Sequence, residues 1–208
     1  TLEPRVVLAF TPGNLLVSNA PFNQQAKLYE YDILGNLVQE MDIPEVDGGS
    51  RDLTVDNSGS IQIYNGTLSP SLSTYDPVAN TFKHHTFKGW STASNLTFGG
   101  LTANDDYIFA TDNKTGNDTN SERGIVRFDP ADGSAKRFWS EHGDIIDIVI
   151  GLNGLLYTLG PTGSPIGTTV HEYNPSDMEF LRTIDLPRQH RAIAVDSNGD
   201  IFATGQDI

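Results

Sequence analysis

One stretch decides the fold of this chain, and it reads Arg191-Ala-Ile-Ala-Val-Asp-Ser-Asn-Gly-Asp-Ile-Phe-Ala-Thr204. Its Asn198-Gly199 pair favours a tight hairpin turn, because both residue types tolerate a positive φ. On both sides of this pair, apolar residues alternate with small or polar ones, which is the pattern of strands that bury one face. The stretch therefore predicts a strand, a tight turn and a second strand.

The second of these strands recurs throughout the chain. The counterparts of its first residue, Ile201, are Leu15, Ile61, Ile108 and Leu156. Successive starts are 46, 47, 48 and 45 residues apart, and two of the five copies are the same tetrapeptide, Ile-Phe-Ala-Thr. A turn rich in Gly, Asn or Asp precedes each copy. Self-similarity at a fixed period indicates a repeat architecture.

A second anchor follows in four of the repeats, where an aromatic residue precedes Asp or Asn: Tyr31-Asp32, Tyr75-Asp76, Phe128-Asp129 and Tyr173-Asn174. The ring covers the sheet and the Asx side chain caps the turn, while the Pro that follows in three cases stops strand pairing. A further strand is predicted after each anchor: Leu37–Met41, Phe82–Thr86, Ala135–Trp139 and Phe180–Ile184. No segment shows a helical apolar period, so each repeat is four antiparallel strands.

Four antiparallel strands in a repeat of this length predict an all-β fold, a β-propeller of four-stranded blades. A two-sheet sandwich would not repeat its turns at fixed spacing. We expect one propeller domain over 1–208, with blades at 5–43, 51–87, 97–140 and 145–185 and an incomplete blade at 191–208. About four and a half blades are thus present. We expect the chain to be part of a five- to seven-bladed ring. The alternative is that a partner completes the last blade by strand addition.

The composition excludes several classes of function. The net charge of −14 disfavours nucleic acid and anionic membrane surfaces as partners. With no cysteine, the chain holds no disulfide, zinc–thiolate site or thiol nucleophile. No apolar run reaches the length of a membrane span, so membrane insertion is not expected.

The repeats resemble those of the NHL, SMP-30/gluconolactonase and virginiamycin-B-lyase-like propellers. The stretch quoted first and Gly124-Ile-Val-Arg-Phe-Asp-Pro-Ala-Asp-Gly133 carry the resemblance, which extends over nearly the whole chain. It implies the propeller scaffold. The lactonases hold a divalent metal with Glu, Asn and Asp at the channel mouth, but no Glu stands at the start of any first strand here. The lyases use a His pair, and none aligns.

In a propeller, the second-to-third-strand loops and the blade-to-blade loops meet at the mouth of the central channel, where ligands bind. Three arginines share one repeat position near this face, eight residues before a turn glycine: Arg5, Arg51 and Arg191. The planar guanidinium suits an anion or carboxylate ligand. The alternative is that each arginine bonds neighbouring carbonyls or pairs with a nearby Asp.

Other candidates lie in the same loops. His142 and His190, with Asp144, are weak candidates for acid–base catalysis. Trp90 either forms an aromatic platform for a sugar or covers the edge of the core.

Asp196, Asn198 and Asp200 resemble the start of a calcium loop, but the glycine is misplaced and no bidentate Glu follows, so a plain hairpin turn is favoured. Apart from such a divalent cation, no cofactor is expected. Four glycan acceptor sequences indicate an extracellular or cell-surface origin, at Asn65, Asn95, Asn113 and Asn117.

The sequence thus favours an extracellular binding module over an enzyme, with a protein, a carbohydrate or a small anionic molecule as ligand. Two alternatives remain open. One is a metal-dependent lactonase or lyase that acts through carboxylates and His142 or His190. The other is a structural subunit of a surface layer or filament, assembled through its incomplete last blade.

Overall fold

A computed structural model describes residues 10–19, 25–47, 50–65, 71–86, 100–112, 124–131, 133–139, 145–160 and 167–205. The chain divides into two compact units, Thr1–Thr86 and Phe87–Ile208, and each is described by itself. The described ranges contain no helix long and apolar enough to cross a membrane.

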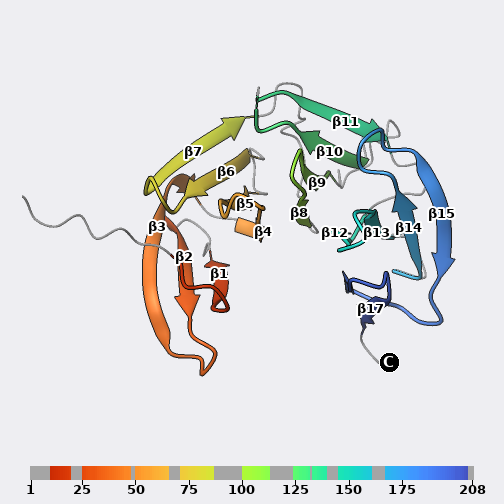
Figure 1. Cartoon of the computed structure of the whole chain (residues 1–208), viewed down its shortest axis with the longest axis horizontal. Helices are drawn as coiled ribbons and strands as arrows, with labels where there is room; N and C mark the ends of the chain where they lie inside the picture. The colour runs from red at the N-terminus through yellow and green to blue at the C-terminus, as the bar shows by residue number, and fades with distance from the viewer. Residues whose placement is uncertain are drawn as a thin grey trace, which may run out of the picture. The chain divides into compact units, whose positions relative to one another are not determined.

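Unit 1 consists of two antiparallel sheets (Figure 1). The first has the order β1-β2-β3, formed by Leu15–Asn19, Gln25–Tyr31 and Leu37–Asp47. The second has the order β4-β5-β6-β7, formed by Ser50–Val55, Ile61–Asn65, Ser71–Asp76 and Thr81–Thr86. In both sheets, sequence neighbours are also hydrogen-bonded neighbours, which is the up-and-down order of a propeller blade.

Unit 2 repeats this order in three sheets. The first contains β8 (Leu101–Ala103), β9 (Ile108–Asp112), β10 (Gly124–Phe128) and β11 (Ala135–Trp139). The second contains β12 (Asp147–Ile150), β13 (Leu156–Gly160), β14 (Thr169–Tyr173) and β15 (Phe180–Asp185). The third is the hairpin of β16 (Ala192–Val195) and β17 (Ile201–Thr204). The first strands of these sheets, β8, β12 and β16, pack side by side.

The predicted strands are confirmed, and three of their boundaries differ: β7 begins one residue earlier than predicted, β15 ends one residue later, and β3 ends six residues later. All five predicted second strands begin at the predicted residue, and each predicted third strand ends at its aromatic anchor or one residue later. The strand that starts at Leu37 was expected to end at Met41, but β3 continues through Pro44 to Asp47. A register shift between Gln25 and Lys27 admits the extra residues opposite β2, so pairing resumes beyond the predicted end.

The hairpin turns are held by backbone conformation and by Asx side chains. Gly13, Gly59, Gly154 and Gly199 have φ between +80° and +91° at the first turn of their repeats. Asp32 Oδ1 shows the capping, because it accepts hydrogen bonds from Leu34 N at 2.9 Å and Asn36 N at 2.8 Å. Short turns of this kind set the register of the strands that they join.

The core of each unit lies between consecutive sheets. In unit 1, Ala26, Leu28 and Ile43 pack against buried side chains of the next sheet, Ile61, Ile63 and Tyr75. In unit 2, Phe109 and Ile125 face Ile145, Ile148, Leu156 and Tyr173. On the other side of that sheet, Tyr157, Leu159 and Val170 face Ile193 with Val195, Ile201 and Ala203. Each sheet therefore buries residues on alternate positions of its second strand against different neighbours.

An arginine reinforces one of these interfaces in unit 2. The Arg127 guanidinium lies 4.2 Å from the centre of the Tyr107 ring and 5.1 Å from that of Phe138. Its Nη1 donates to the carbonyl oxygens of Pro175 and Ser176, which belong to the β14–β15 turn of the next sheet. Stacking and hydrogen bonding together fix this turn against the preceding sheet.

Candidate functional site

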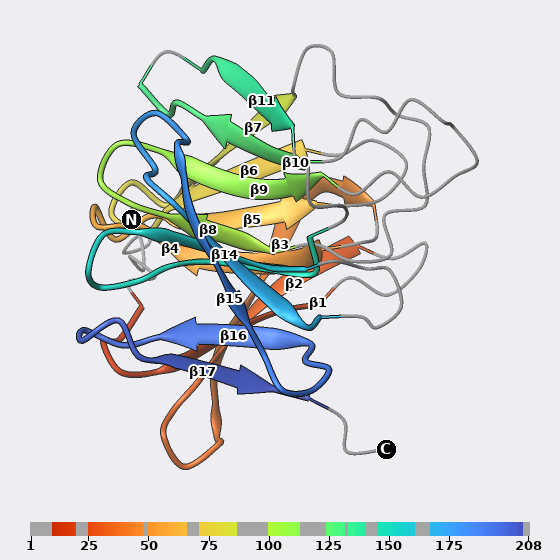
Figure 2. The same cartoon turned by 90° about the vertical axis from the view of Figure 1, so that its right-hand side faces the viewer.

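The two ends of the sheets differ in how their strands are connected. Because the strands alternate in direction, the first-to-second and third-to-fourth turns lie at one end of each sheet. In Figure 2, β16 runs toward the left, turns at Asn198-Gly199 and returns as β17. The longer connections, such as residues 87–100 and 113–123, join strands at the opposite end. We call this opposite end the connection end.

Asp147 is the best-defined polar group at the connection end of unit 2. It begins β12, where its Oδ1 accepts a hydrogen bond from Ile148 N at 2.9 Å. Its Oδ2 accepts one from Ile193 N at 2.8 Å, although Ile193 lies in the next sheet. Burial raises the pKa of this carboxyl, and the two backbone hydrogen bonds oppose that shift. The carboxylate therefore ties two first strands together at the inner edge of their sheets.

The preceding sheet also approaches Asp147 closely. A Cβ added to Gly100 would lie 3.0 Å from Asp147 Oδ1 and 2.9 Å from Ile148 N. Gly100 N donates to Thr111 Oγ1 at 2.9 Å, so this backbone is held in place. Further along, Thr102 Oγ1 accepts a hydrogen bond from Ile150 N at 3.0 Å, which links β8 to β12. Only a residue without a side chain fits at position 100.

Asp147 was not among the residues predicted from the sequence, although a signal was present. Asp52 occupies the same repeat position, and its Oδ1 also accepts a hydrogen bond from the following amide, Leu53 N, at 2.9 Å. Each of them is the fourth residue from the end of the first strand of its sheet. The sequence shows that Asp52 and Asp147 occupy the same position of their repeats. It does not show that Asp147 binds Ile193, which lies 46 residues further along the chain.

Of the three phased arginines, only Arg191 has a described side chain. It is exposed, and its backbone N donates to Thr204 O at 2.6 Å at the start of the β16–β17 hairpin. Arg51 lies in β4 next to a register shift between Ser50 and Asp52, but its side chain is outside the described set. Arg5 also lies outside the described residues. A shared arginine site stays a prediction.

His190 is half-buried in the connection between β15 and β16. Its backbone N donates to Gly167 O at 3.0 Å, and its Nδ1 is buried without a hydrogen-bond partner in the described part of the chain. A Cβ at Gly205 would lie 3.1 Å from this Nδ1 and only 2.0 Å from Gln189 O. The histidine ring is thus enclosed by close backbone approaches on this side.

The remaining loop candidates are not described. His142, Asp144 and Trp90 lie outside the described residues, as do Asn95, Asn113 and Asn117. Asn65 ends β5, with its side chain outside the described set. Their predicted roles in catalysis, ligand binding and glycosylation stay predictions.

The calcium candidate lies at the turn end, in the hairpin between β16 and β17. Asp196 Oδ1 accepts hydrogen bonds from Asn198 N at 2.8 Å and from Asp200 N at 2.9 Å. Asp56 Oδ1 accepts two backbone N–H groups in the same way in its own turn. Within the described ranges, no three His, Asp or Glu side chains gather as metal ligands would. The geometry fits the hairpin turn that the sequence analysis favoured.

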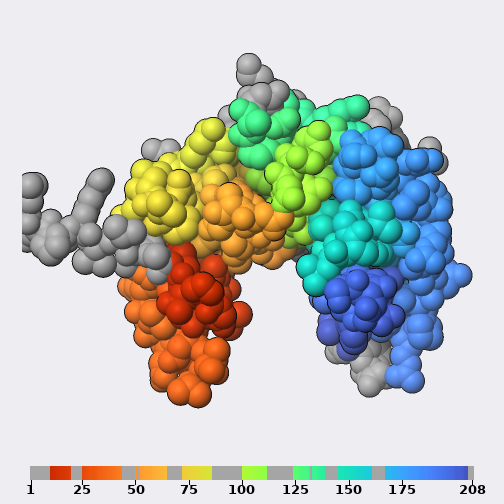
Figure 3. All heavy atoms as spheres, in the orientation of Figure 1, coloured from red at the N-terminus to blue at the C-terminus, as the bar shows by residue number. Residues whose placement is uncertain are grey.

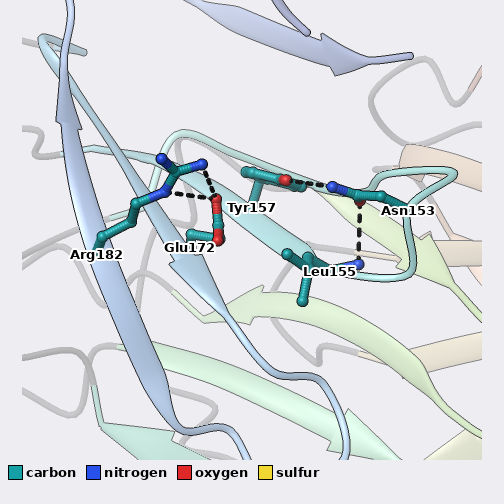
Figure 4. Close-up of polar contacts among 5 residues, drawn as sticks. All are labelled: Asn153, Leu155, Tyr157, Glu172 and Arg182. Carbon is teal, nitrogen blue, oxygen red and sulfur yellow. Dashed lines mark hydrogen bonds and ion pairs between the residues drawn. The ribbon is translucent and has the colours of Figure 1, made fainter. Parts of the chain in front are cut away.

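Other buried polar groups lie within single sheets and support the strands. In the sheet β12–β15, Arg182 Nε and Nη2 donate to Glu172 Oε2 at 3.0 and 2.8 Å (Figure 4). Asn153 donates to the Tyr157 hydroxyl at 2.7 Å and accepts from Leu155 N. These pairs satisfy buried polar atoms beside the turn and do not converge on one point.

A polar chain also crosses the sheet β4–β7. Gln62, which is 1% exposed, donates to Asp56 Oδ2 at 2.8 Å and accepts from Thr74 Oγ1 at 2.6 Å. The Thr74 hydroxyl lies 3.3 Å from His85 Nε2, and burial lowers the pKa of His85. This chain begins at the turn end of the sheet and links three strands.

Two solved structures are similar to the chain over most of its length. A gluconolactonase from Xanthomonas campestris has a TM-score of 0.61 and 16% sequence identity, with 92% of this chain and 65% of that chain covered. The WD40 domain of Pan2 from Neurospora crassa has a TM-score of 0.59 and 15% identity, with 96% of this chain and 62% of that chain covered. The chain therefore spans less than two thirds of the length of each. No protein-family model and no curated protein sequence matches it.

The sheets and these likenesses define the chain as a β-propeller of four-stranded antiparallel blades, as the sequence predicted. At these identities the likeness extends to the fold, and the function has to be argued from the site.

Proposed function

We propose that this β-propeller is a binding module that takes its ligand at the connection end of its sheets. The observation that carries the proposal is the difference between the two ends. Turns of a few residues, capped by Asx side chains, close one end, whereas all the longer connections leave from the other. Connections of variable length on a rigid scaffold are where propellers and other folds place their binding residues.

Asp147 gives this end the rigidity that such a site needs. Its carboxylate joins β12 to β16, and Gly100 lets β8 approach the same point. Both oxygens of Asp147 already accept backbone N–H groups, so this carboxylate supports the scaffold and is not free to act as a base. A rigid rim lowers the ordering cost of binding.

The ligand class that the residues favour is an anionic carbohydrate or another small carboxylate. Arg191 is exposed at this end, and Arg51 holds the same repeat position in β4. A guanidinium binds a carboxylate through two parallel hydrogen bonds, which gives orientation as well as affinity. In a chain with a net charge of −14, such a site would be a local exception to the overall field.

The test is calorimetric titration with uronic acid oligosaccharides, using their neutral counterparts as the control ligands. We expect binding of the acidic sugars that falls at least tenfold in R191M and that persists in K83M, whose lysine is exposed on β7. Equal binding of neutral and acidic sugars, or unchanged binding by R191M, would contradict an anion site.

A metal-dependent lactonase is the second candidate. It is favoured by the likeness to the gluconolactonase. Metal content measured after dialysis against Ca²⁺ or Zn²⁺, together with hydrolysis of a sugar lactone, distinguishes the two proposals. One bound ion per chain with lactone hydrolysis would replace the binding module by the enzyme.

We also propose that the protein is extracellular or displayed on the cell surface. The four glycan acceptor sequences support this location, because such tripeptides are modified only on the secretory route. A mass that decreases after glycosidase treatment of protein from its native host would support it. An unmodified mass in a host that glycosylates proteins would contradict it.

A further inference from the structure

Side chains that lie directly opposite one another cross the sheets of unit 2 in rows, and two of these rows end at a second surface. One row of the sheet β8–β11 contains Phe109, Arg127 and Lys136. One row of the sheet β12–β15 contains Leu156, Tyr173 and Phe180. Directly opposite residues share a face of their sheet. Phe109, Leu156 and Tyr173 pack in one buried cluster, so the two rows face each other. Lys136 on β11 and Phe180 on β15 are the outer ends of the rows.

The first row places two cations directly opposite each other. Arg127 precedes the aromatic anchor Phe128, and Lys136 is its partner on the fourth strand. In three other sheets, these two repeat positions hold Glu30 with Gln39, Thr74 with Lys83 and Glu172 with Arg182. Like charges directly opposite each other destabilise a sheet. Among the described residues, no carboxylate pairs with Arg127 or Lys136, so neither positive charge is neutralised there.

An aromatic ring offsets only part of this repulsion. Lys136 Nζ lies 4.8 Å from the centre of the Phe138 ring, and the Arg127 guanidinium lies 5.1 Å from it. A ring attracts cations through its quadrupole but carries no net charge. Arg127 is also held toward the next sheet, because its Nη1 donates to the carbonyl oxygen of Ser176, whereas Lys136 is exposed. Lys136 is therefore the cation that a carboxylate from outside the chain can reach.

An aromatic side chain at the end of the facing row is incompletely covered. Phe180 packs edge-on against the Tyr173 ring, with the ring centres 5.8 Å apart, and it is 42% exposed. Phe82 occupies the same repeat position in β7, but it packs against the buried core cluster of unit 1. In Figure 3, the green atoms of β10 and β11 lie next to the blue atoms of β15 at the surface. We call Arg127, Lys136, Phe138 and Phe180 the Lys136 surface.

We propose that the Lys136 surface binds an acidic peptide segment of another protein, in which a carboxylate lies next to an apolar side chain. The carboxylate pairs with Lys136 and reduces its repulsion with Arg127. The apolar side chain covers the exposed part of Phe180 and the Phe138 ring. An exposed ion pair alone adds little affinity, so burial of the aromatic rings has to supply most of it. The proposal goes beyond the ligand site at the connection end, because this surface lies on the outer strands beside the β14–β15 turn.

Fluorescence polarisation with labelled synthetic peptides tests the proposal. The probe alternates Glu with Leu, and its two controls replace every Leu by Gly or every Glu by Lys. We expect saturable binding of the Glu–Leu peptide alone. K136E should weaken this binding about tenfold, because it places a carboxylate against the carboxylate of the peptide. F180A should weaken it about fivefold. K83E is the matched control, because Lys83 is exposed and occupies the repeat position of Lys136 in β7.

Two further measurements separate this surface from a folding effect and from the ligand site. K136E replaces a like-charge pair by an opposite pair, so it should raise the melting temperature while it weakens the peptide; K136E alone decides the test if F180A does not fold. R191M should leave peptide binding unchanged, and K136E should leave the titration with acidic sugars unchanged. A Glu–Leu peptide that does not bind at about 1 mM overturns the proposal. Equal binding by K136E and K83E, or loss of the peptide in R191M, overturns it as well.

Discussion

Replacing Asp147 with alanine tests whether one carboxylate holds two blades of the propeller together. In the folded chain Asp147 accepts hydrogen bonds from Ile148 N at 2.9 Å and Ile193 N at 2.8 Å. Both donors belong to buried residues, with 3% and 8% of their surface exposed. Alanine removes both acceptors, so both N–H groups lose the partner that they have in the wild type. We expect D147A to loosen the contact between β12 and β16.

The magnitude follows from the two bonds and from the burial of the charge. A hydrogen bond to a charged acceptor contributes about 1.5–3 kcal/mol, so two bonds set an upper limit of about 6 kcal/mol. Burial of the carboxylate, which raises its pKa, offsets part of this. We expect a net loss of about 3 kcal/mol in the free energy of unfolding. For a domain of this size, that loss lowers the melting temperature by about 6–12 °C.

Differential scanning calorimetry measures this loss, and amide hydrogen exchange at Ile193 localises it. The control is D129A, because Asp129 Oδ1 accepts a hydrogen bond only from Ala131 N in its own turn among the described contacts. That variant should lose about 1 kcal/mol. A D147A melting temperature within about 2 °C of that of D129A, with unchanged exchange at Ile193, would refute a cross-sheet role for Asp147.

The pH dependence gives an independent check on the same residue. Because the pKa of Asp147 is raised on folding, the folded chain binds more protons than the unfolded chain between the ordinary Asp pKa and the raised one. The stability that Asp147 contributes is therefore greatest in acid and decreases as the pH rises through this window. The stability difference between the wild type and D147A should shrink with rising pH, and a difference that grows would contradict the argument.

Three further variants test other parts of the fold. For Glu30, burial alone would raise the pKa, but hydrogen bonds led by that from Thr11 N hold it below its usual value. Its stabilising effect is present at neutral pH and lost in acid, so E30Q should lower the melting temperature near neutrality and converge with the wild type toward about pH 2. Gly154 has a φ of +80°, and no atom lies within 4 Å of a Cβ added there. G154A should therefore lower the free energy of unfolding by about 1 kcal/mol through backbone strain alone. Urea denaturation should show this as a lower midpoint with an unchanged slope. Arg127 lies 4.2 Å from the Tyr107 ring centre, and R127M should lose about 1–2 kcal/mol in thermal denaturation. Because lysine cannot reproduce the planar stack, an R127K variant as stable as the wild type would contradict that account.

Most of the strand pattern was predictable because it depends on neighbours in the sequence. The Asn-Gly and Asp-centred turns, the alternation of apolar residues and the aromatic anchors act within a few residues. They placed the start of all five second strands correctly. The end of β3 was wrong because the pairing beyond Met41 depends on a register shift in β2, which no local signal in β3 reveals.

The candidate site was less predictable, because its contacts join distant parts of the chain. The repeat position that the three arginines share predicted a site at the connection end, but it did not indicate what Arg191 contacts. Asp147 shared its phase with Asp52, yet its partner Ile193 lies in another repeat. Nothing in the sequence around Gly100 indicates that the backbone of β12 lies against it. Residues that support a site from a neighbouring blade leave no pattern within their own repeat.

The sequence alone determined the local structure of each repeat, since both Ile-Phe-Ala-Thr copies begin the second strand of their sheet, in Ile108–Asp112 and in Ile201–Thr204. It did not determine the environment of those strands. Phe109 is fully buried and Phe202 is 61% exposed, although the tetrapeptide around them is the same. The physical reason is that a strand needs only backbone hydrogen bonds and alternating side chains, whereas burial needs a second sheet, and only the tertiary structure decides where that sheet lies.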